Sequence, residues 1–211
     1  MPMTARVRAT GLSHRFDGTP DLFQDLSFDI ASGEVIGLCG PSGCDKSTLL
    51  SLLAGWETPT RGAIERIGIG RVGWVFQNPH GVPRRTTLDH VVFPFLTRGL
   101  SRRQAEAEGL RTLALFGLES VAHRPFRALS GGEAQRLMLT RAVSAAPGLL
   151  LVDEPTAQLD TRTAHEVNTT LGQVAGGGSI VVVATHDPET RAACTRVFDL
   201  IDYAPSERSA A

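Results

Sequence analysis

Three short apolar runs of the sequence each end in residues capable of chemistry. Residues 34–39 lead into a glycine-rich loop, residues 149–152 end at two carboxylates, and residues 179–184 end at a threonine and a histidine. The runs at 149–152 and 179–184 are typical of central parallel strands covered on both faces, and 34–39 is expected to form a buried strand. Their alternation with helical segments predicts an α/β fold built on a doubly wound, mostly parallel sheet.

The remaining segments complete this pattern. Alternating apolar residues predict half-buried antiparallel strands at 6–16 and 25–30, and further strands are expected at 71–76 and 196–201. Helices are expected at 47–54, within 100–117, at 130–146 and before the glycine turn at 176–178. Ser101 and Gln104 form a capping-box pattern that favours a helix start at this point.

Composition bounds the class of protein. The 211 residues suffice for one sizeable domain, and a net charge of -1 gives no global attraction to nucleic acid. Three cysteines, an odd and sparse set, suit a reducing compartment rather than a disulfide framework. No apolar stretch reaches the roughly 18 residues of a transmembrane helix, and the first residues lack the apolar segment of a secretory signal.

Residues 40–48, GPSGCDKST, carry most of a phosphate-binding loop. In the general pattern G-x-x-x-x-G-K-[ST], Gly40, Lys46 and Ser47 match, whereas Asp45 takes the place of the second glycine. Backbone N–H groups of such a loop wrap phosphates, and the following helix adds its positive end. The predicted nucleotide site comprises Gly40, Pro41, Ser42, Gly43, Cys44, Asp45, Lys46, Ser47 and Thr48.

Asp45 is expected to weaken this site for two reasons. Its Cβ stands where the backbone must approach a phosphate closely. Its carboxylate faces an anion, and at about 5 Å and an effective dielectric of about 20 each like-charge pair costs roughly 3 kcal/mol. That is on the order of a hundredfold in affinity. The alternative is an Asp45 side chain that points outward and is tolerated. Cys44 is interpreted as a small residue that fits, with an oxidisable thiol as the alternative.

Two further segments are candidates for contact with phosphate. LLLVDEPT at 149–156 places Asp153 and Glu154 at a strand end, where both can reach the phosphate region. LSGGE at 129–133 opens a helix. The backbone donors of Ser130, Gly131 and Gly132, with the helix dipole, form a second anion site. One chain does not need two such sites for one nucleotide.

These segments, together with VVVATHD at 181–187, resemble in their order a complete ATP-binding cassette (ABC) transporter ATPase subunit over about residues 5–203. The resemblance implies a P-loop NTPase-like, mostly parallel sheet with an antiparallel β subdomain and an inserted α-helical subdomain. It divides a single domain into an ATP-binding core at 1–77 and 141–203, a helical subdomain with the signature at 78–140, and a tail at 204–211.

The resemblance also implies ATP and Mg²⁺ as cofactors and a role for individual residues. Ser47 ligates Mg²⁺, Asp153 holds it through water, and Glu154 polarises the attacking water as general base. His186 contacts the γ-phosphate. Gln77 matches a glutamine that ligates Mg²⁺ and senses the membrane partner, with a plain strand-end amide as the alternative. Phe16 matches the aromatic residue that stacks on adenine, with core packing as its alternative.

The implied partners are a second ABC ATPase subunit and separate transmembrane permease subunits, without nucleic acid. In this family the signature of one subunit covers the γ-phosphate held by the other, so a homo- or heterodimer is expected on ATP binding. Asp160 resembles the aspartate that contacts the opposing subunit, and it can also cap the helix that begins at Thr161. Residues 91–96 (VVFPFL) are a candidate permease-docking surface, with a buried core role as the alternative.

The leading interpretation is a cytoplasmic subunit, peripheral at the inner face of the membrane, that binds and hydrolyses ATP to power a transporter and is weakened by Asp45. The alternative is a degenerate, non-hydrolysing regulatory or structural partner. A DNA-repair ATPase would carry long heptad arms between the phosphate loop and the signature, and none fit here. A translation factor of this family would carry two cassettes, and this sequence has one. An unrelated phosphate-loop kinase gives no reason for LSGGE.

Overall fold

The computed structural model describes residues 5–41, 43–157 and 159–205. Its strands are β1 (Arg6–His14), β2 (Phe23–Ala31), β3 (Val35–Cys39), β4 (Arg61–Ile67), β5 (Val72–Val75), β6 (Leu149–Asp153), β7 (Ile180–Ala184) and β8 (Arg196–Asp199). Its α-helices are α1 (Lys46–Ala54), α2 (Thr87–Thr97), α3 (Arg102–Leu115), α4 (Gly131–Ser144), α5 (Thr161–Gly176) and α6 (Pro188–Ala193). Short 3₁₀ turns are η1 (Glu119–Val121), η2 (Phe126–Ala128) and η3 (Leu200–Tyr203).

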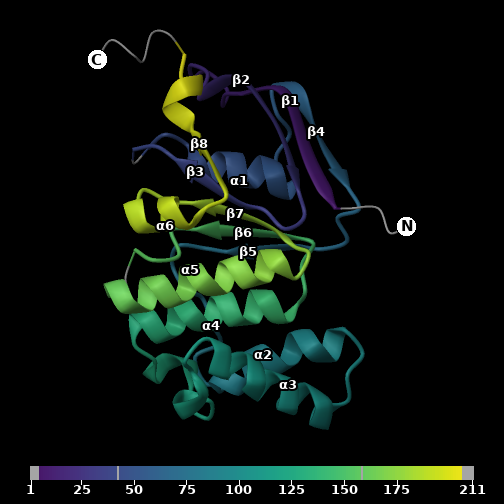
Figure 1. The fold of residues 1–211 in the computed structure, drawn as a ribbon, viewed down its shortest axis with the longest axis vertical. Helices are drawn as coiled ribbons and strands as arrows, with labels where there is room; N and C mark the ends of the chain where they lie inside the picture. Colours follow the sequence, from purple (N-terminus) through teal and green to yellow (C-terminus); the bar gives the residue numbers. More distant parts are fainter. Residues whose placement is uncertain (1–4, 42, 158, 206–211) are drawn as a thin grey trace.

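The strands form two sheets (Figure 1). One is antiparallel, with the order β2-β1-β4, and the other is parallel, with the order β5-β6-β7-β3-β8. In the parallel sheet Ala184 of β7 pairs with Leu38 of β3 on one side and with Asp153 of β6 on the other. The loops that follow these three strands therefore start side by side at one edge of the sheet.

The elements stack in layers (Figure 1). The antiparallel sheet, α1 and the parallel sheet follow one another, α5 and α4 cover the other face of the parallel sheet, and α2 and α3 lie outermost. Leu149 and Leu151 of β6 pack on the α1 side, whereas Leu150 and Val152 pack on the α4–α5 side. Because both faces of the strand are covered, every position of its apolar run is buried.

This architecture confirms the predicted fold class. The expected strands at 6–16, 25–30, 34–39, 71–76, 149–152, 179–184 and 196–201 correspond to β1, β2, β3, β5, β6, β7 and β8. The helices expected at 47–54 and 130–146, and within 100–117, correspond to α1, α4 and α3. The capping box of Ser101 and Gln104 at the start of α3 is present in the structure.

Sequence analysis missed β4, α2 and α6. β4 has no fully buried residue, so it gives no apolar signal, and it joins the antiparallel sheet by pairing with β1. α2 contains Pro94, which normally argues against a helix. Two features outweigh this proline: a capping box of Thr86 and Asp89 at the helix start, and the buried side chains of the helix.

The segment 91–96 of α2 serves mainly as core. Val91, Val92 and Phe95 are buried, whereas 64 % of Phe93 is exposed. The alternative of a core role therefore holds for most of the segment, and Phe93 alone is a large apolar side chain left on its surface.

Helix α4 crosses the predicted boundary between residues 140 and 141, which divides the helical subdomain from the ATP-binding core. The helix runs from Gly131 to Ser144 across that division and packs against both α2 and β5. The division into subdomains stays a prediction. Residues 206–211 of the expected tail lie outside the described residues.

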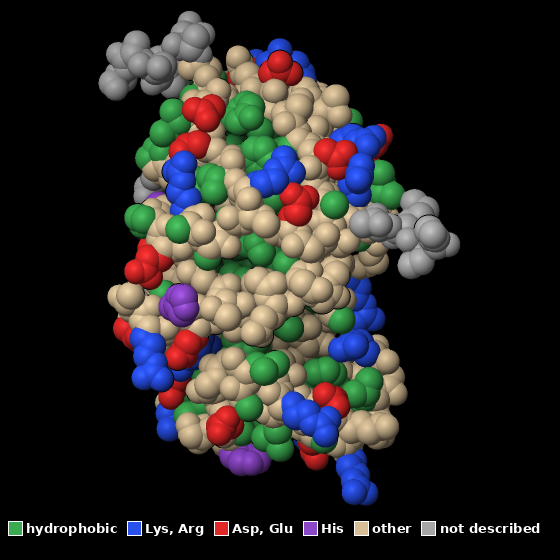
Figure 2. Space-filling view, viewed as in Figure 1, with side chains coloured by type: hydrophobic (Ala, Val, Ile, Leu, Met, Phe, Trp, Pro, Cys, Tyr) green, Lys and Arg blue, Asp and Glu red, His purple; other side chains and the backbone are tan. Residues whose placement is uncertain are grey.

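The surface agrees with the near-neutral net charge. Figure 2 shows basic and acidic side chains interspersed over the face it displays. Within the described residues, every helix is too short or too polar to cross a membrane.

His90 is buried and forms two hydrogen bonds through its ring. Its Nε2 accepts a hydrogen bond of 2.9 Å from the Val82 N–H, and its Nδ1 lies 2.7 Å from the Thr86 carbonyl oxygen, so the ring is neutral with its proton on Nδ1. Burial lowers the pKa of His90 below its ordinary value, and the hydrogen bond to Thr86 opposes this in part.

We predict that the free energy of unfolding falls as the pH drops below about 6.5, the pKa of an unperturbed histidine. The unfolded chain binds a proton there, whereas the folded His90 resists it, so acid favours the unfolded state. Urea unfolding at pH 7.5 and 5.5 measures the effect. His90→Leu should reduce the difference between the two pH values. An unchanged difference in that variant would assign the acid sensitivity to other groups.

Candidate nucleotide-binding site

Two glycines of the loop between β3 and α1 have left-handed backbone conformations. Gly40 and Gly43 have φ angles of 137° and 83°, which favour glycine. A Cβ on Gly40 would lie 2.5 Å from the Cys44 sulfur, so the Cys44 side chain would have to shift to admit any other residue. Pro41 is exposed between them, and Thr48 lies in the first turn of α1. Ser42 lies outside the described residues.

Asp45 adopts a left-handed backbone conformation, with φ 63° and ψ 29°, directly before α1. Its side chain makes no capping hydrogen bond to that helix. The conformation is a third reason for glycine at this position, one that the sequence did not show. Aspartate is among the few other residues that enter this region readily. The substitution therefore fits the loop's backbone better than most other side chains would.

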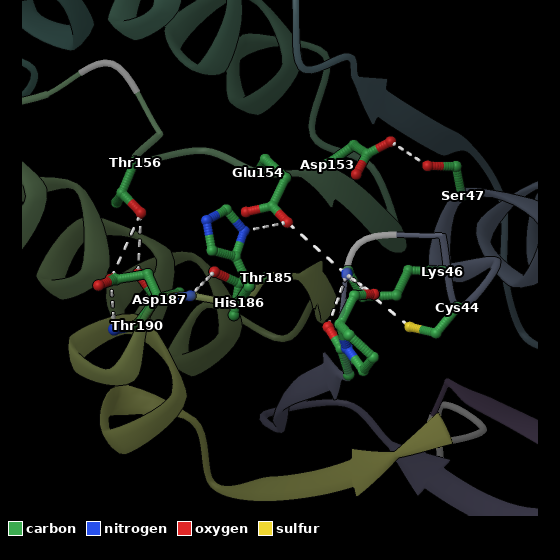
Figure 3. A network of polar contacts seen from close by, with 12 residues as sticks. Cys44, Lys46, Ser47, Asp153, Glu154, Thr156, Thr185, His186, Asp187 and Thr190 are labelled. Carbon is green, nitrogen blue, oxygen red and sulfur yellow. Dashed lines mark hydrogen bonds and ion pairs between the residues drawn. The ribbon is translucent and has the colours of Figure 1, made fainter. Parts of the chain in front are cut away.

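Lys46 connects the loop to the carboxylates opposite (Figure 3). Its ammonium donates hydrogen bonds to the carbonyl oxygens of Gly40, at 2.9 Å, and Pro41, at 3.3 Å. It also lies 3.9 Å from Glu154 Oε1, and both side chains are more than nine-tenths buried. Burial raises the pKa of the neighbouring Cys44 thiol, so the structure favours Cys44 as an unreactive small residue.

Ser47 and Asp153 bring two oxygen ligands together. The Ser47 hydroxyl donates a hydrogen bond of 2.6 Å to Asp153 Oδ2 (Figure 3). Burial raises the pKa of Asp153, and the hydrogen bond from Ser47 counteracts this. A hydroxyl and a carboxylate suit a hard cation such as Mg²⁺. The described residues hold no group of three His, Cys, Asp or Glu that could bind a metal alone, so such a cation would complete its shell with phosphate and water.

Glu154 and His186 form a second pair beside the loop. His186 Nδ1 lies 2.8 Å from Glu154 Oε1, and because a carboxylate only accepts, Nδ1 carries the proton. Glu154 Oε2 is buried and has no hydrogen-bond partner among the described residues. The Glu154 backbone has φ 47° and donates to the Ala184 carbonyl oxygen at 2.9 Å. Such a strained backbone at a strand end is common where a side chain must be aimed into a site.

Sequence reasoning gave no role to a buried network behind His186 (Figure 3). Asp187 Oδ2 accepts from the Thr190 N–H at 2.9 Å and from the Thr190 hydroxyl at 2.6 Å. The Thr156 hydroxyl lies 3.1 Å from that of Thr190. Thr156 and Asp187 stand inside the quoted segments DEPT and THD, so their positions were visible. Thr190 follows in α6, which the sequence analysis missed.

The other predicted contacts of the nucleotide lie on the surface. Phe16 is 45 % exposed and meets the buried His14 edge to face, with ring centroids 5.2 Å apart, so its core alternative is wrong. Gln77 follows two residues after β5 and is exposed. Among the described residues it makes no hydrogen bond to Ser47 or Asp153, and its role stays a prediction.

The signature segment opens a helix as expected. Ser130 caps α4 by accepting from the Glu133 N–H at 3.2 Å, and Glu133 accepts in return from the Ser130 N–H at 2.8 Å. The N–H groups of Gly131 and Gly132 lie in the first turn, where a helix has no internal acceptors for them. Asp160 caps α5 by accepting from the Thr163 N–H, which confirms its predicted capping role.

Comparison with known proteins now decides the family. Residues 23–157 match the family described as ABC transporter. The chain belongs to the ABC transporter ATPase family. It is similar to the lipoprotein-releasing system ATP-binding protein LolD of Ruegeria sp. (strain TM1040), with 39 % identity over 90 % of this chain and 92 % of the relative. The LolD of Cereibacter sphaeroides is 38 % identical over 87 % and 89 % of the two chains.

Solved structures agree with this assignment. A dimeric structure of the ATP-binding cassette MJ0796 in a post-hydrolysis state, bound to ADP and Pi, superposes with a TM-score of 0.81 at 26 % identity. The superposition covers 92 % of this chain and 94 % of that one. As an ABC transporter ATPase, the chain is an ATP-binding subunit of a family that hydrolyses ATP to power transport.

Proposed function

We propose that this subunit hydrolyses ATP with Glu154 as general base and powers a transporter through separate permease subunits. The observation that carries the proposal is the meeting of Lys46, Ser47, Asp153, Glu154 and His186 at one edge of the parallel sheet (Figure 3). A cationic side chain, a hydroxyl–carboxylate pair and a second carboxylate are the parts that phosphoryl transfer to water needs.

Each residue of this group receives one role. Lys46 offers its ammonium to the β- and γ-phosphates in place of its loop carbonyl acceptors. Ser47 and Asp153 would hold Mg²⁺, which would neutralise charge on the phosphates. Glu154 accepts a proton from the attacking water on Oε2, because the His186 Nδ1–H already occupies Oε1. His186 contacts the γ-phosphate through Nε2, which donates a hydrogen bond to it only when both ring nitrogens carry a proton.

The remaining assignments concern the rim of the site. The exposed ring of Phe16 gives adenine a stacking surface, and phenylalanine serves because stacking does not need a hydroxyl. Gln77, exposed beyond β5, links the nucleotide to the membrane partner. The N–H groups of Gly131 and Gly132 bind the γ-phosphate held by a second subunit.

We predict that Glu154→Gln lowers the turnover number by roughly 10²–10⁴-fold, the range of general base catalysis, while the Kd for ATP changes little. The amide keeps the shape and the contact with His186 but cannot take a proton. Single-turnover cleavage and ATP titration measure the two quantities. Glu189→Gln, an exposed carboxylate on α6, is the matched control and should leave both unchanged. Normal cleavage in Glu154→Gln would exclude the general-base role.

The proposed dimer can be tested at Ser130 without removing its helix cap. Asparagine and aspartate both cap helices well, so Ser130→Asn and Ser130→Asp should fold alike. We expect Ser130→Asp to abolish ATP-driven dimerisation and turnover, because its carboxylate would face the phosphate of the partner. Binding of ATP to the monomer should stay intact. Light scattering with ATP measures the dimer. Equal loss of monomer binding in Ser130→Asp would mean that the signature serves its own chain.

The permease is proposed to bind at two neighbouring pockets that Phe93 lines. Two hollows of about 450 and 380 Å³ lie beside the exposed ring of Phe93, and Arg141 lines both of them. Apolar side chains such as Phe76 and Val82 also line these hollows, which suits an amphipathic helix of a membrane subunit. Docking there would hold the ATPase at the cytoplasmic face of the membrane.

Asp45 is proposed to weaken ATP–Mg²⁺ binding. We expect Asp45→Gly to strengthen binding at least about tenfold, since the electrostatic cost alone corresponds to roughly a hundredfold. Asp45→Asn should recover only part, because it removes the charge and keeps the Cβ. Asparagine also tolerates the left-handed backbone, so the two variants separate charge from bulk. Titration with labelled ATP at equal salt and Mg²⁺ measures each Kd.

Three equal affinities would show that the Asp45 side chain points away from the phosphates. A wild-type chain that binds ATP but shows no turnover, alone or with its permease, would favour the alternative of a non-hydrolysing partner subunit.

A further inference from the structure

Helix α5 carries a buried amide on the face that packs against α6. Asn168 is only 9 % exposed, among the apolar neighbours Ala164, Val167 and Leu171. Its Nδ2 donates a hydrogen bond of 3.1 Å to the Thr190 hydroxyl oxygen in α6. Its Oδ1 is buried without a hydrogen-bond partner among the described residues. A leucine of similar size would avoid the cost of that unpaired oxygen, so the amide is not explained by packing.

The direction of each hydrogen bond follows from the carboxylate of Asp187. A carboxylate only accepts, so the single hydroxyl proton of Thr190 is directed to Asp187 Oδ2 at 2.6 Å. The Thr190 oxygen then accepts from Asn168 at 3.1 Å, and it lies 3.1 Å from the Thr156 hydroxyl, whose own proton can go to Thr190 or, at 3.5 Å, to Asp187 Oδ2. This also fixes the orientation of the Asn168 amide, with its NH₂ group toward Thr190. Asn168 thus orients the hydroxyl that holds Asp187.

Asp187 in turn fixes the loop that carries His186. Its N–H donates to the Thr185 hydroxyl at 3.0 Å, and its side chain caps α6. His186 therefore lies between two residues whose side chains are held, and its ring meets Glu154 at 2.8 Å. Thr156 ties the same network to the loop that follows Glu154. The network joins the two segments whose side chains form the catalytic pair (Figure 3).

We propose that Asn168 is a positioning residue for hydrolysis: through Thr190 and Asp187 it sets the loop that holds the His186 ring against Glu154. The inference rests on the proposed roles of His186 and Glu154 and adds a residue on α5 to the machinery.

Asn168→Leu tests this without creating a cavity. We expect the turnover number to fall about fivefold or more at saturating ATP, the coupling typical of a hydrogen-bond network, with the KM for ATP unchanged. Thr190→Val removes the same hydrogen bond from the other side and should lower the turnover number to a similar extent. In the double variant the turnover number should fall no further than in the more affected single variant. Thermal unfolding should show Asn168→Leu to be at least as stable as the wild type.

Thr170→Val is the matched control. Thr170 lies on the same helix and is also buried, but its hydroxyl donates to the Glu166 carbonyl within α5, and among the described residues it makes no hydrogen bond to the His186 loop. Turnover should be unchanged in this variant. The NMR signals of the His186 ring, assigned with His186→Ala, give a readout that needs no catalysis. They should shift in Asn168→Leu and in Thr190→Val but not in Thr170→Val.

Three outcomes would overturn the inference. The first is that Asn168→Leu keeps wild-type turnover and an unmoved His186 signal while His186→Ala loses turnover. This result would exclude the positioning role and leave the proposed function intact. Additive losses in the double variant would show that Asn168 and Thr190 act separately. Full turnover in His186→Ala would exclude a catalytic role for His186. It would then also exclude the proposed role of Asn168 in positioning the ring.

Discussion

The structure depends on the in-register pairing of three parallel strands. Leu38 of β3, Ala184 of β7 and Asp153 of β6 lie in one row of backbone hydrogen bonding, although the sequence separates them widely. β6 and β7 end at Asp153 and Ala184, and β3 ends one residue after Leu38, so the chain leaves the sheet at the same edge in all three strands. A slip of one residue would turn every side chain of a strand to the opposite face of the sheet. Because both faces are apolar, a slipped strand would still bury apolar side chains. Burial alone therefore does not fix this register. The backbone pairing sets where Lys46, Glu154 and His186 meet.

Charge at this edge is balanced within a small volume. Lys46 faces the loop carbonyls and Glu154, while Asp153 has its pKa raised by burial and is stabilised by the Ser47 hydroxyl. Glu154 shares one oxygen with His186 and Lys46 and keeps the other unpartnered among the described residues. Buried groups of this kind are costly to a fold and are concentrated where chemistry occurs. Asp45 brings a further carboxylate to the same loop, in a conformation that favours glycine.

The network behind the site extends this picture into the core. Thr156, Asp187, Thr190 and Asn168 come from two loops and two helices and are joined by hydrogen bonds to one another, while Asn168 Oδ1 has no partner among the described residues. Such a network has few alternative arrangements, because each hydroxyl has one proton to give. It ties the His186 loop to α5 and α6 through hydrogen bonds.

The sequence alone determined the fold class, the family resemblance and the residues of the phosphate loop, because continuous apolar runs and fixed short motifs are local signals. It also indicated the helix caps at Ser101 and Asp160, which depend on neighbours a few residues away. Only the tertiary structure decided that Phe16 is exposed, that Phe93 alone of its segment faces outward and that Asp45 has a left-handed backbone. It alone joined Asn168 to Thr190 and Asp187, since that contact depends on how α5 packs against α6, which no local pattern encodes.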